Sequence, residues 1–380
     1  MSGSSLDGLD IVSAHLQEKA STAKGPKSWE YTLVHTACYP YPEEWRQRLA
    51  AAPGLSALDY QLLHVEYGRY LGEQVLRFIE EFGLHYQVQL VVSHGHTAFH
   101  LPMGGKTVQR GGAAHVGMTA QLGDGAALAA VTGINVVSDL RSMDVALGGQ
   151  GAPIVPIGEL LLLPGYDFYL NLGGIANLSR HDGVTGGETV GGGFVAFDVV
   201  PANRVLNSLV AEIGQAYDAD GVMAATGRVD EGLLEELNAL SYYSLPYPKS
   251  LANEFGTETV LPMIKAAGLP TADALRTYVA HIVQQVTMAV RSFEVETPAR
   301  LLATGGGAHN KFLIDRLRAE LIGIGVEVIV PEPQLVDFKE ALVMALIGVL
   351  RWREERNVLA SVTGATRDSI GGAVYIGQEG

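Results

Sequence analysis

Glycine-rich turns at three widely separated positions are the first residues in this sequence that could do chemistry. They span residues 3–5, 173–174 and 305–307. A glycine turn beside a strand exposes backbone N–H groups without a Cβ in the way, which suits a phosphate group, and the hydroxyls of Ser4 and Ser5 add donors. A single turn of this kind is better interpreted as part of an ordinary tight hairpin. The recurrence is a weak internal repeat that predicts two related lobes.

Histidines form a second group that could bind a ligand. His94, His96 and His100 all lie within residues 93–100. His94 and His96 would share one face of a strand, as metal ligands do, but no nearby Cys or carboxylate completes a metal site. We favour hydrogen bonding to a polar ligand at a strand end. Solvent-exposed loop histidines are the alternative.

An arginine between two aspartates precedes a glycine-rich loop at residues 148–153. These residues are Asp139, Arg141 and Asp144. Two carboxylates with a guanidinium can bind a polyhydroxy substrate or a carboxylate. An ion pair between lobes, capped by a turn, fits the same residues.

A further carboxylate, Asp198, follows the apolar run 194–197 and stands three residues before Pro201. Flanking apolar residues would desolvate this carboxyl and raise its pKa, which suits a general base. An aspartate that stabilises a helix N-terminus has the same spacing. Neither GxxxxGK[ST] nor a full GxGxxG occurs, so a P-loop or Rossmann enzyme is unsupported.

Helices and strands that must position these groups alternate along the chain. Apolar periodicity predicts a helix over 57–82 that ends at Gly83, and Asp124 is expected to cap a helix at 125–131. Pro201 is expected to open a helix that runs to about residue 213. Further helices are predicted at 272–293, 309–321 and 336–354, and strands at 88–92, 134–138, 167–172, 177–180, 300–304 and 326–330. Such alternation indicates an α/β protein with largely buried sheets.

Composition narrows the class of protein. The 380 residues carry a formal charge of −15, which disfavours nucleic-acid binding, and a hydrophobic content of 47% excludes intrinsic disorder. The single cysteine, Cys38, excludes a disulfide framework and suits a reducing cytosol. The N-terminus lacks the features of a signal peptide, and the most apolar stretch, 341–352, is short of the roughly 18 residues that span a bilayer. We therefore expect a cytoplasmic protein without a membrane partner.

These motifs occur together, in order, over nearly the whole chain. They are residues 1–10, 93–97, 121–126, 139–153, 171–178, 197–203, 217–221, 248–250, 304–308, 337–341 and 362–365. The ordered set resembles the anhydro-N-acetylmuramic acid kinases, a family within the actin/hexokinase/Hsp70-like ATPases. The resemblance implies an α/β, two-lobed actin-like ATPase fold of the ribonuclease H-like type with an interlobe cleft. We expect an N-terminal lobe at 1–138 plus 361–380 and a C-terminal lobe at 139–360.

The same resemblance implies an ATP-dependent phosphotransferase with an alcohol group as acceptor. Water would open the 1,6-anhydro bridge of anhydro-N-acetylmuramic acid, and O6 would take the γ-phosphoryl group to give N-acetylmuramate 6-phosphate, an intermediate of peptidoglycan recycling. Asp198 would be the base that activates the water. The expected nucleotide contacts are Gly3, Ser4, Ser5, Leu6, Asp7, Gly8, Leu9, Asp10, Gly173, Gly174, Gly305, Gly306 and Gly307. The expected sugar contacts are His94, Arg141, Asp144, Gln150 and Glu340.

The resemblance also implies a Mg²⁺ ion that bridges the phosphates, held mostly through waters and by a carboxylate such as Asp7 or Asp10. The expected partners are ATP and the amino sugar, and a homodimer is compatible with the family. A non-catalytic actin-like ATP-binding switch and a kinase for another sugar are the alternatives. Asp198 and the histidine-rich segment favour an enzyme over the switch.

Two departures from the family pattern bear on activity. The family usually has several residues of strand before Met-Ser-Gly, so we expect the phosphate hairpin at 3–10 to be held less firmly here. The common Phe-Asp-Thr-Gly-Pro-Gly-Asn reads Phe197-Asp-Val-Val-Pro-Ala-Asn203 in this chain. Loss of a hydroxyl and two glycines near the γ-phosphate is expected to shift substrate choice or slow turnover.

Overall fold

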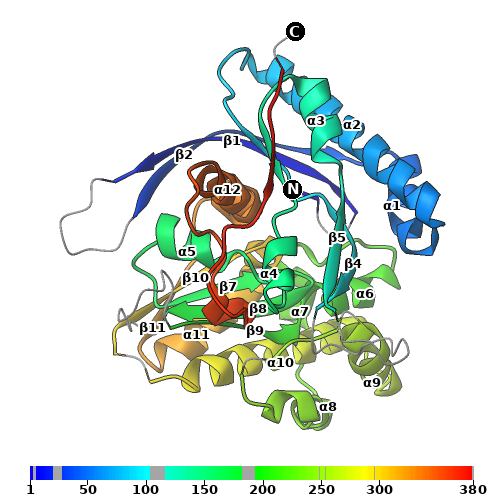
Figure 1. The fold of residues 1–380 in the computed structure, drawn as a ribbon. Helices are drawn as coiled ribbons and strands as arrows, with labels where there is room; N and C mark the ends of the chain where they lie inside the picture. The colour runs from blue at the N-terminus through cyan, green and yellow to red at the C-terminus, as the bar shows by residue number, and fades with distance from the viewer. Residues whose placement is uncertain are drawn as a thin grey trace. The chain divides into compact units, whose positions relative to one another are not determined.

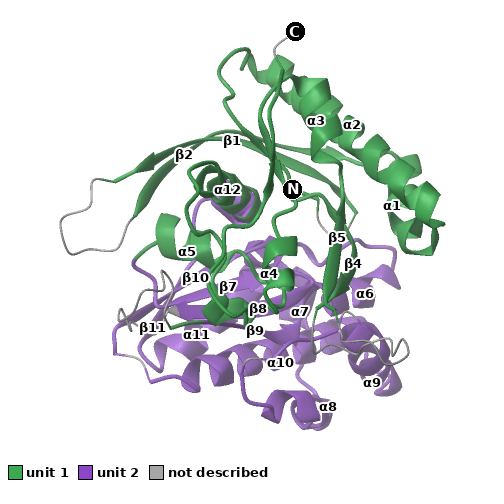
Figure 2. Cartoon of the chain, in the orientation of Figure 1, with its two compact units in different colours: residues 1–164, 184–194, 340–380 green, residues 165–183, 195–339 purple. Residues whose placement is uncertain are grey.

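Helices and strands alternate along the chain in the computed structural model, as the sequence predicted (Figure 1). The structure describes residues 1–2, 6–19, 28–102, 116–181, 193–247, 249–252, 254–294 and 296–378. Contacts divide the chain into unit 1, residues 1–164, 184–194 and 340–380, and unit 2, residues 165–183 and 195–339 (Figure 2). The lobe boundaries predicted near 138 and 360 stay a prediction, as does the interlobe cleft; the boundaries of these units lie elsewhere.

Unit 2 is built on a single five-stranded sheet with the order β11-β10-β7-β8-β9. Its strands are β7 (Phe168–Leu172), β8 (Ile175–His181), β9 (Phe194–Pro201), β10 (Ala299–Thr304) and β11 (Val326–Ile329). β7 pairs antiparallel with β8 and parallel with β10, and β10 pairs parallel with β11. This is the strand order of a ribonuclease H-like domain, in which the first strand along the chain is central. The predicted α/β class is confirmed.

Helices of unit 2 supply the apolar side chains that cover this sheet. They are α6 (Asn203–Ala211), α7 (Val222–Thr226), α8 (Glu231–Asn238), α9 (Leu261–Ala266), α10 (Thr271–Arg291) and α11 (Lys311–Ile322), with short helical turns at Ala219–Gly221, Ser241–Ser244, Phe255–Val260 and Gly306–His309. Leu170 and Leu301 of the sheet, Tyr278 and Ile282 of α10 and Leu317 of α11 belong to one buried cluster. Burial on both faces explains why these strands read as near-continuous apolar runs.

Unit 1 contains several smaller sheets. β1 (Gly8–Glu18) and β2 (Trp29–Pro40) form an antiparallel hairpin, and β4 (His96–Leu101) pairs with β5 (Met118–Leu122). A separate sheet has the order β12-β6-β3, from Ala373–Tyr375, Val136–Ser138 and Val91–Val92. The helices are α1 (Glu43–Ala51), α2 (Ala57–Phe82), α3 (Gly125–Thr132), α4 (Ser142–Ala146), α5 (Pro156–Leu162), α13 (Ala360–Thr363) and the turn Ala52–Gly54. α12 (Pro333–Trp352) begins in unit 2 and ends in unit 1.

Local signals explain the helices of unit 1. Ser56 accepts a hydrogen bond from the Asp59 N–H at the start of α2, and Gly83 ends this helix with a φ of 64°. Asp124 caps α3 through the N–H of Ala127. α2 and α3 pack closely because Gly68 has no side chain: a Cβ there would lie 2.4 Å from the Asp124 carbonyl oxygen. The predictions for both helices are confirmed.

Two local predictions were wrong at their boundaries. The strand expected at 88–92 is only Val91–Val92. Pro201 does not open a helix, because β9 continues through it and α6 begins at Asn203. Proline suits both places, since the N–H that it lacks is dispensable at a helix start and at the end of an edge strand such as β9. Among the described residues no helix is long and apolar enough to cross a bilayer.

Candidate active site

The second and third glycine turns meet at one edge of the sheet of unit 2. Residues 173–174 follow β7 and Gly305 follows β10, and these neighbouring strands are parallel. Gly305 has a φ of 81°, and a Cβ there would lie 2.4 Å from Asn171 Oδ1. A Cβ at Gly307 would lie 2.8 Å from the Leu172 Cβ. The turn at 305–307 therefore needs glycine, whereas a Cβ at Gly173 or Gly174 would make only ordinary contacts. Both turns lie where ligands bind in parallel sheets, outside the carboxyl ends of the strands.

The start of α6 holds the turn at 173–174 in place. The Ala202 N–H donates to the Gly174 carbonyl oxygen at 2.8 Å, and the Asn203 N–H donates to that of Gly173 at 3.1 Å. The Asn203 side-chain amide donates to the Leu172 carbonyl oxygen at 3.0 Å. Asn203 lies in a motif that was quoted for the resemblance, yet the sequence alone did not assign it to the site.

The altered residues beside Asp198 fit into the protein without strain. Val199 and Val200 are buried in the core of unit 2. Ala202 has a φ of −119°, so its backbone does not require glycine. The departure from the family pattern at these positions is thus accommodated by apolar packing.

Asp198 lies inside β9 and is held by three hydrogen bonds. Its Oδ2 accepts from the Leu251 N–H at 2.8 Å, and its own N–H donates to the Lys249 carbonyl oxygen at 3.1 Å. The Tyr242 hydroxyl donates to its carbonyl oxygen at 2.5 Å. Burial raises the pKa of Asp198, and the Leu251 N–H opposes this. The helix-capping alternative does not fit, because α6 begins five residues later.

Three of the five predicted sugar contacts lie together in unit 1. The Arg141 Nε donates to His94 Nε2 at 2.9 Å, and His94 Nδ1 is 2.9 Å from the Gly95 carbonyl oxygen. The ring is therefore neutral, with its proton on Nδ1. Burial and the neighbouring Arg141 hold the pKa of His94 well below its usual value. Burial lowers the pKa of Arg141 to about 10, and the nearby carboxylate of Glu340 opposes this.

The other two predicted sugar contacts belong to the glycine-rich loop. Asp144 is fully buried: its Oδ1 accepts from the Thr363 hydroxyl and its Oδ2 from the Gly151 N–H, both at 2.7 Å. A Cβ at Gly149 would lie 2.2 Å from Asp144 Oδ2, so the loop can close on this carboxylate only with glycine there. Gln150 is exposed on the same loop. Asp144 thus shapes the loop that carries Gln150.

A polar cavity of about 230 Å³ in unit 1 includes His94. It is also lined by His64, Ser93, Thr119, Gln121, Asp139 and Tyr375, among others. The Gln121 Nε2 donates to the hydroxyls of Thr97 and Thr119, whereas its Oε1 is buried without a hydrogen-bond partner within the described part of the chain. Sequence reasoning gave Gln121 no role, although it lies in one of the quoted motifs.

The predicted N-terminal phosphate hairpin is described only in part. Gly3, Ser4 and Ser5 lie outside the described residues. Leu6 has a φ of 56°, and the side chain of Leu9 is buried in the core of unit 1. The other members of the hairpin also contact protein: Asp7 Oδ1 accepts from the Gly8 N–H at 3.0 Å, and a Cβ at Gly8 would lie 2.6 Å from Cys38 Sγ.

Asp10, one of the two carboxylates predicted to hold Mg²⁺, is surrounded by protein groups. Burial raises the pKa of Asp10, whose side chain is hydrogen-bonded to Cys38 and lies near the Met1 ammonium. The described residues contain no group of three or more His, Cys, Asp or Glu side chains that could hold a metal ion. Asp10 therefore fits poorly as a ligand for Mg²⁺.

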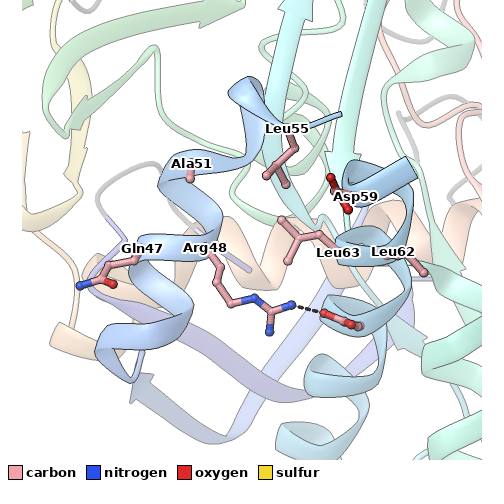
Figure 3. Close-up of a pocket in the computed structure, with 8 residues that line it drawn as sticks. Gln47, Arg48, Ala51, Leu55, Asp59, Leu62 and Leu63 are labelled. Atoms are coloured by element: carbon pink, nitrogen blue, oxygen red, sulfur yellow. Dashed lines mark hydrogen bonds and ion pairs between the residues drawn. The ribbon is translucent and has the colours of Figure 1, made fainter. Parts of the chain in front are cut away.

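Another surface hollow lies elsewhere in unit 1, between α1 and α2. Its volume is about 460 Å³ (Figure 3). The dashed line in Figure 3 marks the ion pair between Arg48 on α1 and Glu66, a residue of α2. Leu55, Leu62 and Leu63 add apolar side chains to the lining. None of the predicted site residues lines this hollow.

Two glycine turns at the ends of neighbouring parallel strands, with a partly desolvated carboxylate on the same sheet, define an α/β protein suited to phosphate binding and proton transfer. The chain belongs to the anhydro-N-acetylmuramic acid kinase family, because the sequence pattern of that family matches residues 1–377. The family inferred from the motifs is confirmed.

Curated relatives match over almost their full length. The anhydro-N-acetylmuramic acid kinase of Gloeobacter violaceus is 35% identical over 377 residues, which cover 97% of this chain and 95% of the relative. The anhydro-N-acetylmuramic acid kinase of Streptomyces coelicolor is 35% identical over 390 residues, which cover 100% of this chain and 93% of the relative. A solved ROK family glucokinase from Streptomyces griseus aligns with 89% of this chain and 99% of that chain at 11% identity, but its TM-score of 0.35 supports no further conclusion.

Proposed function

We propose that this chain is an ATP-dependent kinase that opens 1,6-anhydro-N-acetylmuramic acid and phosphorylates it at O6. The observation that carries the proposal is membership of the kinase family over residues 1–377. The paired glycine turns of unit 2 and the desolvated Asp198 support it, because phosphoryl transfer depends on positioning and charge stabilisation more than on covalent chemistry. The product, N-acetylmuramate 6-phosphate, belongs to peptidoglycan recycling.

In the proposed reaction, Asp198 takes a proton from water while the water oxygen bonds to C1 and the C1–O6 bond breaks. O6 then bonds to the γ-phosphorus of ATP, and ADP leaves. The raised pKa of Asp198 makes it a stronger base than an exposed aspartate. Magnesium would supply charge neutralisation on the ATP phosphates; with no carboxylate cluster among the described residues, it would be held mainly by those phosphates and by water.

We assign the phosphates of ATP to the turn at 173–174 and its nucleoside to residues 305–307, with residues 3–10 contributing to the phosphate site as the resemblance implies. In unit 1, Arg141 and Glu340 are assigned to the sugar. His94 keeps Arg141 oriented, and Asp144 holds the loop of Gln150. The unpaired Gln121 Oε1 supports an additional contact to an O–H or N–H group of the sugar. We also propose that the protein is cytoplasmic and forms a homodimer.

The test is to incubate the protein with ATP, Mg²⁺ and the anhydro sugar and to analyse the products by mass spectrometry. We expect equal amounts of ADP and the phosphosugar. ATP binding without any phosphosugar would instead support the non-catalytic switch. Phosphorylation of an open-ring sugar alone would support a kinase for another substrate.

A further inference from the structure

We propose that Lys249 is a positioning residue for Asp198. Its ammonium contacts Tyr242 and Tyr243, and the described residues of the segment 242–251 supply hydrogen bonds to Asp198 from outside β9. The inference rests on the proposed function, in which Asp198 is the base. It also identifies the reacting atom: Oδ1 takes the proton, because Oδ2 already accepts the Leu251 N–H.

One short segment controls the orientation of Asp198. The Tyr242 hydroxyl, the Lys249 carbonyl oxygen and the Leu251 N–H contact the Asp198 carbonyl oxygen, N–H and Oδ2 at 2.5, 3.1 and 2.8 Å. After the short helical turn Ser241–Ser244, the described residues up to Leu251 form neither helix nor strand. No helix or strand fixes their conformation, so side-chain contacts contribute to it.

Lys249 supplies that restraint. Its Nζ donates to the carbonyl oxygens of Tyr242 and Tyr243 at 3.2 and 3.3 Å, and it lies 4.7 Å from the centroid of the Tyr242 ring. Hydrogen bonds from a charged donor are stronger than those between neutral groups, and the ring face adds attraction. The ammonium thus links Lys249, which lies beside the Leu251 N–H that binds the Asp198 carboxylate, to Tyr242, which binds the Asp198 carbonyl oxygen.

A buried polar chain fastens the other end of the segment to the helices. The Tyr243 hydroxyl is 2.9 Å from His281 Nε2, and His281 Nδ1 is 2.7 Å from Asn238 Oδ1. The Gln285 side-chain amide donates to the same oxygen at 2.8 Å. Burial lowers the pKa of His281 to about 3, so its ring is neutral and donates from Nδ1. Side chains of α8 and α10 therefore hold Tyr243, whose carbonyl oxygen accepts from Lys249, and Lys249 in turn positions the residues that bind Asp198.

Replacing the lysine by residues that keep or remove its charge tests the proposal. Lys249→Met is expected to lower kcat by about 10- to 100-fold, because small displacements of a catalytic group are costly, while the KM for ATP changes less than about twofold. Lys249→Arg keeps two donors for the two carbonyls and should restore most of the lost kcat. Lys265→Met is the matched control, since Lys265 is half-exposed and pairs only on the surface with Glu212.

Hydrogen exchange gives a readout that does not depend on activity. In protein labelled with ¹⁵N-leucine, the Leu251 amide should exchange faster in Lys249→Met than in the wild type and Lys249→Arg, with Leu170 and Leu172 of β7 unchanged. A wild-type kcat in Lys249→Met, or faster exchange throughout unit 2, would overturn the proposal. If the wild type makes no phosphosugar, the proposed function fails, whereas Leu251 exchange still decides whether Lys249 fixes this segment.

Discussion

The sheets of the two units are built differently. In unit 2 the turn at 173–174 joins β7, the central strand of the sheet, to β8, and residues 202–204 bond to its carbonyl oxygens. In unit 1 the described strands form separate smaller sheets, and residues 1–2 join β1 through a bridge between Ser2 and Leu9 and hydrogen bonds between Met1 and Asp10. The sheet of unit 2 therefore supports the turn at 173–174 from both sides, because a turn is only as fixed as the strands that it joins.

The charged groups of the units differ as well. Unit 1 contributes a half-buried arginine oriented by a neutral histidine, which suits recognition of a polar ligand. Unit 2 contributes a carboxylate whose pKa is raised by burial, which suits proton transfer. The comparison predicts that substitutions in unit 2 change turnover and that those in unit 1 change sugar affinity.

The largest expected effect comes from Asp198→Asn. An amide cannot accept the proton of the attacking water, so kcat should fall by about 100-fold or more while ATP binding is retained. Turnover and nucleotide affinity can be measured separately by product formation and calorimetry. Asp315→Asn, on the surface of α11, is the matched control. Near-normal turnover in Asp198→Asn would show that Asp198 is not the general base.

Alanine substitutions should show which glycine the fold requires. Gly305→Ala places a Cβ against Asn171 at a positive φ, so we expect a loss of about 1–3 kcal/mol in the free energy of unfolding and weaker ATP binding. Gly8→Ala should cost less, because its closest neighbour is the Cys38 Sγ, which can move, and the next is the Tyr39 carbonyl oxygen at 3.0 Å. Chemical denaturation measures both. Equal losses would contradict the stricter requirement for glycine at position 305.

His94 offers a test of recognition in unit 1. His94→Leu leaves the Arg141 Nε without its acceptor, and we expect the KM for the sugar to rise about 10-fold, with the KM for ATP unchanged. His94→Gln retains an acceptor oxygen and should behave more like the wild type. A fall in kcat alone, with both KM values unchanged, would show that His94 acts in catalysis instead.

The smallest effect is a shift in the pH profile. Asp198 acts when deprotonated, and its pKa in the folded protein is raised, so kcat should decline at a higher pH on the acid side than an ordinary aspartate would allow. His94 should not contribute, because its pKa is lowered. Profiles of the wild type and His94→Gln should therefore share the same acid limb. Displacement of that limb in His94→Gln would assign the titration to the histidine.

Local patterns predicted much of the fold but few of the contacts. The span of α2 was predictable because its apolar period, the Ser56 cap and Gly83 agree. The β1–β2 hairpin was not predicted, although exposure alternates along the first half of β2; most residues of the two strands are only partly buried. Motif identity pointed to Asp198 and Arg141. Their partners, Leu251 and His94, lie 53 and 47 residues away in sequence, a separation that no local signal spans.

The most direct test of the account traces the oxygen of water. The reaction is run for a few minutes in H₂¹⁸O with ATP, Mg²⁺ and the anhydro sugar, beside a control in which unlabelled product is kept in the same water. We predict one ¹⁸O atom per phosphosugar, at C1, and none in its phosphoryl group. Label that appears instead in inorganic phosphate, with the sugar unlabelled, would show that water attacks ATP and would contradict the role assigned to Asp198.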